Sequence, residues 1–541
     1  MTQGLWNKIR SSLPGISRRD IFRQGGLLAL AQSVTGVAQR ASAAPLTLGT
    51  KLYESIGVRP VINARGTFTI ITGSQTLPEV KKAMEEASRH YVHLDELMDG
   101  VGARLAELTK AEWGIVTSGC CAALTHFTAA AIAGFNPERM QRLPDLTGLK
   151  NEVIIPSYSR NTYDHAIRML GVQVREAPDL ATLQALMSDR TALIYILAGR
   201  NDSGPFGTKA IADIAKTRDI PVIVDAAAEI LTIPNVHLEH GATAVAYSGG
   251  KCIRGPQAAG LLLGQKSLLQ AAWTNSAPHH AFGRSLKVGK EEIMGMLAAV
   301  EMWVQRDHQA EWKAWESRLE AIGSKLRKID GITATIQQPG EDLSNRTPRL
   351  RVEWSGAKLG ITGQEVAKMM LDSEPRVVVA GATGQRPAQM DSTVSIVPYM
   401  MMPGEEKIVA DKLYGILANP PKFDEPAKPA GSDITVAGQW EVKLDFGRGS
   451  AVHRIVFEQD GTKLVGTHQG EFGAGDLVGT VAGETLQFRS SIPTLGSRVG
   501  FDFSGTMNGN QLRGTVNLGE YGKTTWVAER HTYRSGGRRA G

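Results

Sequence analysis

Two short stretches decide the fold: Pro221-Val-Ile-Val-Asp225-Ala-Ala-Ala-Glu229 and Thr243-Ala-Val-Ala-Tyr247-Ser-Gly-Gly-Lys251. Each begins as a run without charges, which is typical of a strand covered on both faces of a parallel sheet. Each run then leads to a charged residue, Asp225 in the first stretch and Lys251 in the second. Because ligands bind at the carboxyl ends of parallel strands, we expect both charges at one site.

Strands and helices alternate on both sides of these stretches, from Val61 to about residue 290. The candidate strands are apolar segments at 114–117, 152–156, 172–175, 192–197, 221–225, 243–247 and 259–263. Helical patterns lie between them, at 78–110, 122–133, 163–170, 180–187 and 209–217. This alternation predicts an α/β fold with a mostly parallel sheet and helices on both of its faces.

A third stretch, Thr117-Ser118-Gly119-Cys120-Cys121-Ala-Ala123, follows a predicted strand and opens a helix of small residues. A helix start of this kind directs free backbone N–H groups and the positive end of the helix dipole at an anion. Ser118 and the backbone of residues 119–121 could therefore hold a phosphate. Taken alone, the pattern is weak, since many helices start with small residues.

Asp225 and Lys251 also have ordinary explanations, as a helix N-cap and a solvated surface charge. However, a carboxylate at the end of a buried strand needs a partner, and a pyridinium nitrogen would supply one. A lysine in a buried turn can form a Schiff base with an aldehyde. The phosphate turn, the aspartate and the lysine in one sheet together predict pyridoxal 5'-phosphate (PLP) as the cofactor.

Residues 61–290 resemble the fold-type I PLP enzymes, in the branch of the bacterial selenocysteine synthases and the D-glucosaminate-6-phosphate ammonia-lyases. The segments that carry the resemblance are 61–69, 91–97, 117–124, 160–165, 224–229 and 247–260. The likeness continues more weakly to about residue 418. It implies the PLP-transferase fold of type I for the large domain.

The resemblance implies roles for individual residues of this chain. Lys251 would be the catalytic residue that forms the Schiff base, and Asp225 would pair with the pyridine nitrogen. Tyr163 or His165 would cover the cofactor ring. The residues implied to bind the cofactor are Ser118, Gly119, Cys120, Tyr163, His165, Asp225, Ser248 and Lys251, and candidate substrate-binding residues are Arg65, Tyr91 and Arg376.

The same resemblance implies a PLP-dependent enzyme that acts on an amino acid or an amino sugar acid. An α,β-eliminating ammonia-lyase is favoured, and a racemase or an aminotransferase is the alternative, since no residue dictates the branch. A non-catalytic PLP-fold binding or scaffold protein is the alternative of another class, and the intact set of Asp225, Ser248 and Lys251 argues against it. Such enzymes form homodimers or larger homo-oligomers.

Composition and predicted secondary structure divide the chain into several regions. We expect an N-terminal arm and large PLP-binding domain over 44–290 and a small α+β domain over 291–418, which starts with one long helix at 290–325. A linker follows at 419–432. Short alternating segments separated by Gly, Asn and Asp turns predict an all-β sandwich or barrel over 433–530, before a basic tail at 531–541.

The first 43 residues have the pattern of an export signal. Residues 17–23 read Ser-Arg-Arg-Asp-Ile-Phe-Arg, an apolar stretch follows, and Ala41-Ser-Ala43 resembles a cleavage site. The paired arginines favour the twin-arginine route and hence a periplasmic or otherwise exported protein. The apolar stretch is too short to span a bilayer well, so no stable membrane span is expected after processing. The alternative is a basic amphipathic helix that stays attached.

The net charge argues against a nucleic-acid partner, and the cysteines argue against a disulfide framework. The formal net charge of the 541 residues is +6, but residues 1–43 contain six basic residues and one acidic residue, so the remainder has a net charge of only +1. A nearly neutral chain is not expected to bind nucleic acid. The three cysteines (Cys120, Cys121 and Cys252) form no disulfide framework, and no residue spacing predicts a metal site.

Overall fold

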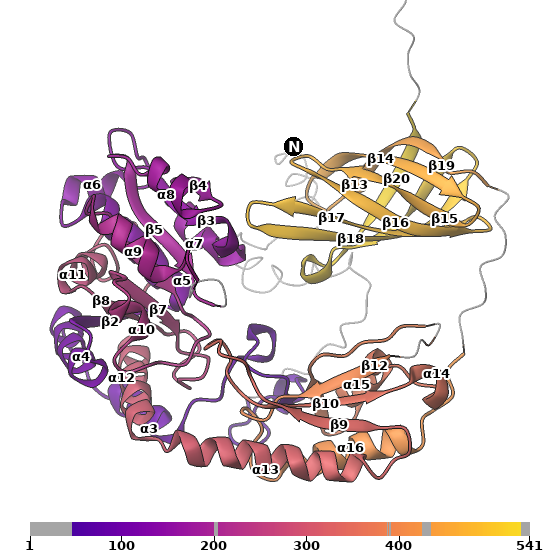
Figure 1. Cartoon of the computed structure of the whole chain (residues 1–541), viewed down its shortest axis with the longest axis horizontal. Coiled ribbons are helices and arrows are strands. Elements are labelled where there is room, and N and C mark those ends of the chain that lie inside the picture. Colours follow the sequence, from indigo (N-terminus) through magenta and orange to yellow (C-terminus); the bar gives the residue numbers. More distant parts are fainter. Residues whose placement is uncertain (1–45, 200–203, 387, 389–390, 425–433, 532–541) are drawn as a thin grey trace, which may run out of the picture. The chain divides into compact units, whose positions relative to one another are not determined.

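The computed structural model describes residues 46–199, 204–386, 388, 391–424 and 434–531 (Figure 1). The predicted signal segment and most of the predicted basic tail therefore lie outside the described residues. The chain divides into two compact units, Met1–Val61 and Ile62–Gly541. The described residues of the first unit hold a 3-10 helix, η1 (Glu54–Ile56).

A seven-stranded sheet forms the centre of the large domain, in the order β2-β8-β7-β6-β5-β3-β4. Strands β3 to β7 run parallel to one another, while β8 runs antiparallel to both β7 and β2. All seven predicted strands appear, as β2 (Trp113–Thr117), β3 (Glu152–Pro156), β4 (Gln173–Ala177), β5 (Thr191–Leu197), β6 (Val222–Asp225), β7 (Ala244–Ser248) and β8 (Gly260–Gly264). The mostly parallel sheet predicted from the sequence is therefore confirmed.

The sheet is buried on both faces. Every residue of β2, β3, β6 and β8 is buried, although successive side chains of a strand point to opposite faces. The helices of this domain are α3 (Pro78–Ser88), α4 (Leu94–Thr109), α5 (Cys120–Ala133), α6 (Pro137–Arg142), α7 (His165–Arg168), α8 (Leu180–Leu186), α9 (Thr208–Lys216), α10 (Val236–Glu239), α11 (Lys266–Thr274) and α12 (Lys290–Gln305). Helix α5 is buried along nearly its whole length, which explains its small side chains.

Two long helices predicted from the sequence are each split in the structure. The predicted helix at 78–110 consists of α3 and α4, separated at residues 89–93. The predicted helix at 290–325 consists of α12 and α13 (His308–Leu326), because Asp307 starts a new helix. Its carboxylate accepts hydrogen bonds from the backbone N–H groups of Gln309 and Ala310, as an N-cap residue does.

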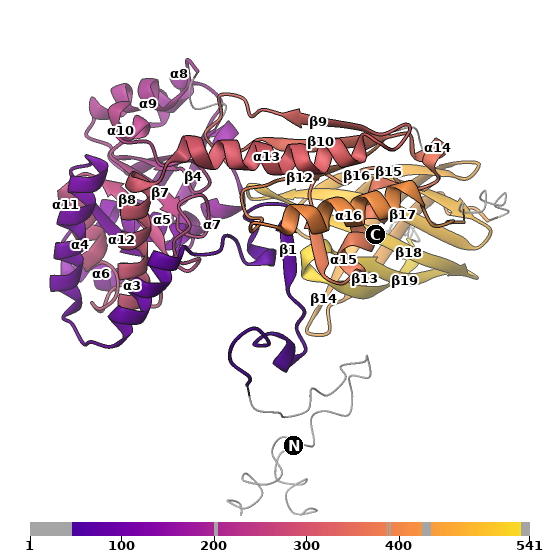
Figure 2. The ribbon, with the colours of Figure 1, turned by 90° about the horizontal axis from the view of Figure 1, so that it is seen from below.

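The small domain combines short strands with helices, as predicted. Its three-stranded antiparallel sheet has the order β12-β10-β9 and packs against α13 (Figure 2). A second pair joins β1 (Val61–Ala64) to β11 (Arg376–Val379). The remaining elements are β9 (Thr333–Gln337), β10 (Arg349–Trp354), β12 (Ser392–Ile396), α14 (Gly356–Leu359), α15 (Gly363–Asp372) and α16 (Glu405–Ala418).

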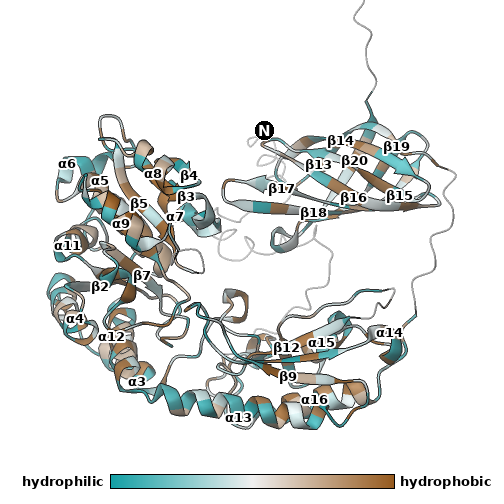
Figure 3. Cartoon of the chain, in the orientation of Figure 1, coloured by the Kyte–Doolittle hydropathy of each residue, from teal (hydrophilic) through white to brown (hydrophobic). Residues whose placement is uncertain are grey.

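The C-terminal region is a closed antiparallel barrel of eight strands, which selects the barrel over the sandwich that the sequence also allowed. Buried and exposed residues alternate along its strands, so polar and apolar bands follow one another (Figure 3). The strands are β13 (Gly438–Asp445), β14 (Ser450–Asp460), β15 (Lys463–Gln469), β16 (Ala474–Ala482), β17 (Thr485–Thr494), β18 (Ser497–Asn508), β19 (Gln511–Asn517) and β20 (Lys523–Arg530).

Among the described residues, no helix is both long enough and apolar enough to cross a bilayer.

Candidate active site

The turn between β2 and α5 has the geometry of an anion-binding loop. Gly119 takes a φ of 84°, a conformation that glycine adopts without strain, and α5 begins at the next residue without a side-chain cap. A Cβ atom on Gly260 would lie 2.4 Å from the carbonyl carbon of Gly119, so only glycine lets β8 run this close to the turn. The first N–H groups of α5 are thus presented at the carboxyl end of β2.

Asp225 ends β6 as a buried carboxylate, 2% exposed. Its Oδ1 accepts a hydrogen bond from the backbone N–H of Ala227 at 3.1 Å and a weaker one from the Cys120 thiol at 3.5 Å. Its Oδ2 accepts from the hydroxyl of Tyr195 at 3.0 Å. Burial raises the pKa of Asp225, and these hydrogen bonds oppose the rise. No ion pair with Asp225 is found in the described part of the chain, so a cation in the cavity would stabilise the carboxylate.

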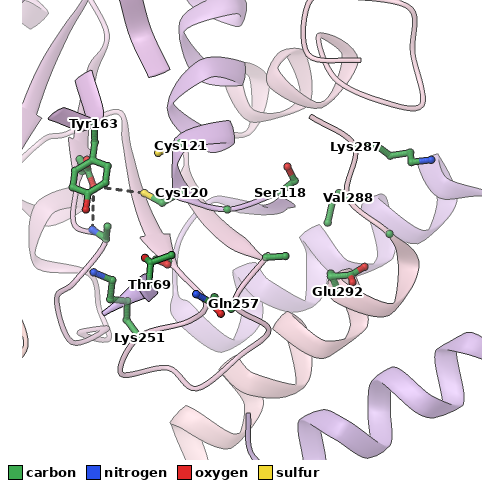
Figure 4. Close-up of a pocket in the computed structure, with 16 residues that line it drawn as sticks. Thr69, Ser118, Cys120, Cys121, Tyr163, Lys251, Gln257, Lys287, Val288 and Glu292 are labelled. Atoms are coloured by element: carbon green, nitrogen blue, oxygen red, sulfur yellow. Dashed lines mark hydrogen bonds between the residues drawn. The ribbon is translucent and has the colours of Figure 1, made fainter. Parts of the chain in front are cut away.

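Lys251 stands in the turn that follows β7. Two glycines precede it in this turn, and both are needed for steric reasons. A Cβ atom on Gly249 would lie 2.5 Å from the carbonyl oxygen of Pro256, and one on Gly250 would lie 2.9 Å from the Gln257 side chain. The glycines therefore let the turn fold tightly against residues 256–259. The amine of Lys251 has no hydrogen-bond partner among the residues that the structure describes, and it faces the cavity (Figure 4).

A cavity of about 550 Å³ brings these three segments together (Figure 4). Of the residues predicted to bind the cofactor, seven line it: Ser118, Gly119, Cys120, Tyr163, Asp225, Ser248 and Lys251. His165 does not line this cavity and is exposed at the start of α7. Between the two candidates for the ring-covering side chain, the geometry therefore favours Tyr163.

The three predicted substrate-binding residues lie outside this cavity. The guanidinium of Arg65 stacks over the ring of Phe68, with its central carbon 4.2 Å from the ring centroid. Tyr91 is fully exposed. Arg376 stands on β11 and donates a hydrogen bond to the backbone oxygen of Leu371. Their predicted role in substrate binding therefore stays a prediction.

Sequence reasoning missed several residues that line the cavity, including Thr69, Gln257, Lys287 and Glu292. Gln257 and Thr69 belong to segments that carry the family resemblance, so the sequence held a signal for both. Lys287 and Glu292 flank the start of α12. Their position at the cavity depends on how α12 packs against the rest of the large domain, and no local sequence pattern indicates that packing.

The residues of the cavity fit PLP. The start of α5 offers N–H donors and Ser118 a hydroxyl for the phosphate, and Asp225 is a buried carboxylate that needs a cationic partner. Lys251 provides a partly buried primary amine in the turn that follows the neighbouring strand β7. The donors, the acceptor and the amine thus match the three functional groups of the cofactor, and the cavity volume is in the range of small-molecule sites.

Known proteins are similar to this chain in sequence and in fold. Residues 86–287 match the family model described as Aminotransferase class-V. The D-glucosaminate-6-phosphate ammonia lyase of Salmonella typhimurium is 29% identical over 334 residues, which cover 60% of this chain and 87% of that protein. The 5'-C-glycyluridine monooxygenase-decarboxylase of a Streptomyces species is 29% identical over 311 residues, which cover 55% of this chain and 76% of that protein.

A solved structure extends the similarity to the fold. The structure described as D-Glucosaminate-6-phosphate Ammonia-lyase superposes with a TM-score of 0.60 at 26% sequence identity, and the match covers 69% of this chain and all of that chain. The barrel of β13–β20 has no part in the family match, which ends at residue 287. The large domain therefore has the class-V aminotransferase fold, of fold type I, and the chain is a PLP-dependent enzyme.

Proposed function

We propose that this enzyme is an ammonia-lyase that converts an amino sugar acid or a β-hydroxy amino acid into a 2-keto acid and ammonia. The observation that carries the proposal is the cavity in which Lys251 and Asp225 meet the anion-binding start of α5. The similarity to a protein named D-glucosaminate-6-phosphate ammonia lyase, which spans most of that protein's length, supports this branch over the others.

Bound PLP withdraws electrons from the carbon that carries the substrate's amino group. The turn at Ser118 to Cys120 would hold the phosphate, and Ser248 would add a hydroxyl donor. Asp225 would keep the pyridine nitrogen protonated, because a buried carboxylate is stabilised by a neighbouring positive charge. Tyr163, at the edge of the cavity, would lie over the ring and restrict access of water.

Lys251 would have two tasks in this arrangement. Its amine would attach the cofactor covalently, and once free it would take the proton from the carbon next to the substrate's amino group. Loss of the hydroxyl group from the next carbon, followed by hydrolysis, then gives a 2-keto acid and ammonia. The water released in the elimination equals the water consumed in the hydrolysis, so the net products are one keto acid and one ammonium ion.

An absorption spectrum tests the central part of this proposal. We expect the purified protein to have a visible band that borohydride removes, and we expect Lys251→Ala to lack it. Ammonia and keto acid release are then measured with D-glucosaminate 6-phosphate and with D- and L-serine. Conversion of the substrate into its other enantiomer, without release of ammonia, would instead identify a racemase. Formation of a keto acid without ammonia, and only when an amino-group acceptor is present, would identify an aminotransferase. Full turnover by Lys251→Ala would refute the assignment of this lysine.

We further propose that the enzyme is exported through the twin-arginine route and works in the periplasm as a homodimer or larger homo-oligomer. The pattern of residues 17–43 supports the first part, and the resemblance to fold-type I enzymes supports the second. Replacing Arg18 and Arg19 together by lysine should retain the protein in the cytoplasm, and light scattering of the processed protein gives its mass. A monomer, or export that does not depend on the arginine pair, would contradict the corresponding part.

A further inference from the structure

A second cavity, of about 730 Å³, lies apart from the one that Lys251 lines, and the two share no lining residue. Its volume is in the range of sites for small molecules. Cys252 and Arg254 line it, so residues from one turn, 251–254, reach both cavities. The proposed reaction gives this second cavity no role.

The second cavity has an excess of positive charge. It is lined by four arginines and one glutamate: Arg254, Arg306, Arg318, Arg346 and Glu311. Glu311 is already paired, because its two oxygens accept hydrogen bonds from Nε and Nη2 of Arg306 at 3.0 and 3.1 Å. In the described part of the chain, the other three arginines form no ion pair. Arg254 and Arg318 donate hydrogen bonds to the backbone oxygens of Gln75 and Met401.

Two further observations indicate that this charge lacks an acceptor. The Nη1 atom of Arg306 is buried and has no hydrogen-bond partner among the described residues, which costs free energy unless an acceptor is supplied. The pKa of Arg254 is lowered by burial and by the nearby charges of Arg306 and Arg318, against the opposing effect of Glu311 and Glu79. An anion bound between these arginines would relieve both effects.

The remaining wall of the second cavity is mostly aromatic and apolar, with His308, Gln309 and Asn345 as its polar residues. Trp303, Trp312, Trp315 and Tyr399 line it, together with Met400 to Met402. The ring of Trp315 is 5.8 Å from that of Trp312 and 6.1 Å from that of Tyr399, so the rings form a continuous surface. Such a surface favours a flat ring, because aromatic pairs gain from edge and offset contacts as well as from burial.

We propose that the second cavity is a binding site for a small aromatic carboxylate, separate from the cofactor site. The carboxylate would contact the arginines, which bind this group through paired N–H donors. The ring would lie against the tryptophans. Inorganic anions lack the ring and neutral aromatic molecules lack the charge, so both should bind more weakly.

The test measures binding of 3-phenylpropionate to the full-length enzyme loaded with PLP, by calorimetry and by the change in tryptophan fluorescence. The probe's neutral amide and inorganic phosphate are the matched controls for charge and for the ring. We expect both controls to bind at least about tenfold more weakly, since a hydrogen bond to a charged group is worth roughly one such factor. We expect Arg346→Gln to weaken binding of the probe by a similar factor.

Arg349→Gln is the control variant, because Arg349 is also exposed, stands three residues away and does not line the cavity. It should bind the probe as the unchanged enzyme does. Equal affinity for the acid and its amide, equal affinity for phosphate, or no binding at all would overturn the proposal. So would binding that occurs only when PLP is absent, since the probe would then occupy the cofactor site. These results do not depend on catalytic activity or on any variant folding.

Discussion

The hydroxyl of Tyr195 donates a hydrogen bond to Oδ2 of Asp225 over 3.0 Å, and both side chains are buried. The same hydroxyl accepts a hydrogen bond from the side-chain amide of Asn161 at 2.9 Å. Its own hydrogen is therefore left for the carboxylate. Burial raises the pKa of Asp225, and the hydrogen bond from Tyr195 opposes that rise, so Tyr195 helps to keep Asp225 ionised.

Replacing Tyr195 by phenylalanine should weaken the enzyme without emptying the cofactor site. Without the donor, the pKa of Asp225 rises further, so the carboxylate is lost at a higher pH. We expect kcat to fall by about tenfold, since a hydrogen bond to a charged group contributes about 1.5–3 kcal/mol. The acidic limb of the pH profile should also move to higher pH, which is measured from kcat across the pH range.

Tyr247→Phe is the matched control for this prediction. Tyr247 is as deeply buried as Tyr195, but its hydroxyl accepts from Asn235 and does not contact Asp225. Its loss should lower the free energy of unfolding and leave the pH profile unchanged. If the two variants shift the pH profile equally, Tyr195 has no specific effect on the carboxylate.

Asp225→Asn tests the charge of the carboxylate with little change in its shape. Asparagine can still accept a hydrogen bond from Ala227, but it cannot pair with a protonated pyridine nitrogen. We expect the variant to keep a visible cofactor band and to lose at least about 100-fold in kcat, as when one preorganised electrostatic contact is removed from an active site. Near-normal turnover in single-turnover measurements would show that the aspartate has only a structural role.

Gly260→Ala tests the close approach of β8 to the phosphate turn. The added methyl group would lie 2.4 Å from the carbonyl carbon of Gly119, so the turn must move away. We expect PLP affinity, measured by titration of the apoenzyme, to fall by at least about tenfold, because one or more of the N–H contacts to the phosphate would be lost.

The control for Gly260→Ala is Gly134→Ala, at the end of α5 that is far from the turn at Gly119. Gly134 has a φ of 57°, and a Cβ atom there would meet no atom within 4 Å. Gly134→Ala should therefore cost stability through backbone strain but leave PLP affinity unchanged. An equal loss of affinity in both variants would mean that α5 as a whole, rather than its first turn, determines binding.

The sequence predicted the sheet and the cofactor site because both depend on local patterns. Continuous apolar runs marked the buried strands, and two of these runs lead to the charged residues Asp225 and Lys251. The substrate-binding residues were harder to predict. Arg65 and Arg376 were chosen from the family resemblance, and their positions relative to the cavity depend on the packing of segments that are distant in the sequence. The split of the helix at 290–325 was missed because both halves are helix-forming, although Asp307 is a recognisable N-cap.

The barrel contains a buried histidine pair that sequence reasoning did not single out. Nδ1 of His453 lies 2.8 Å from Nε2 of His468, and Nδ1 of His468 lies 2.6 Å from the hydroxyl of Ser490. His453 and His468 stand on neighbouring strands, β14 and β15, and both side chains are buried. Burial is the main cause that lowers the pKa of both rings, to about 3 for His468, where the charge of His453 adds to it.

These shifts predict that acid destabilises the barrel. A ring whose folded-state pKa is below its unfolded value of about 6.5 is protonated more readily in the unfolded state. Its contribution to stability is complete above that value and is lost as the pH falls toward the folded-state pKa, at a cost of up to a few kcal/mol.

Hydrogen exchange of β14, β15 and β17, corrected for intrinsic rates, should therefore reveal lower protection at about pH 5 than at about pH 7. His468→Gln should reduce this difference, and His280→Gln, at an exposed site in the large domain, should not. Protection that is independent of pH in the unchanged protein would show that the pair titrates alike in the folded and unfolded states.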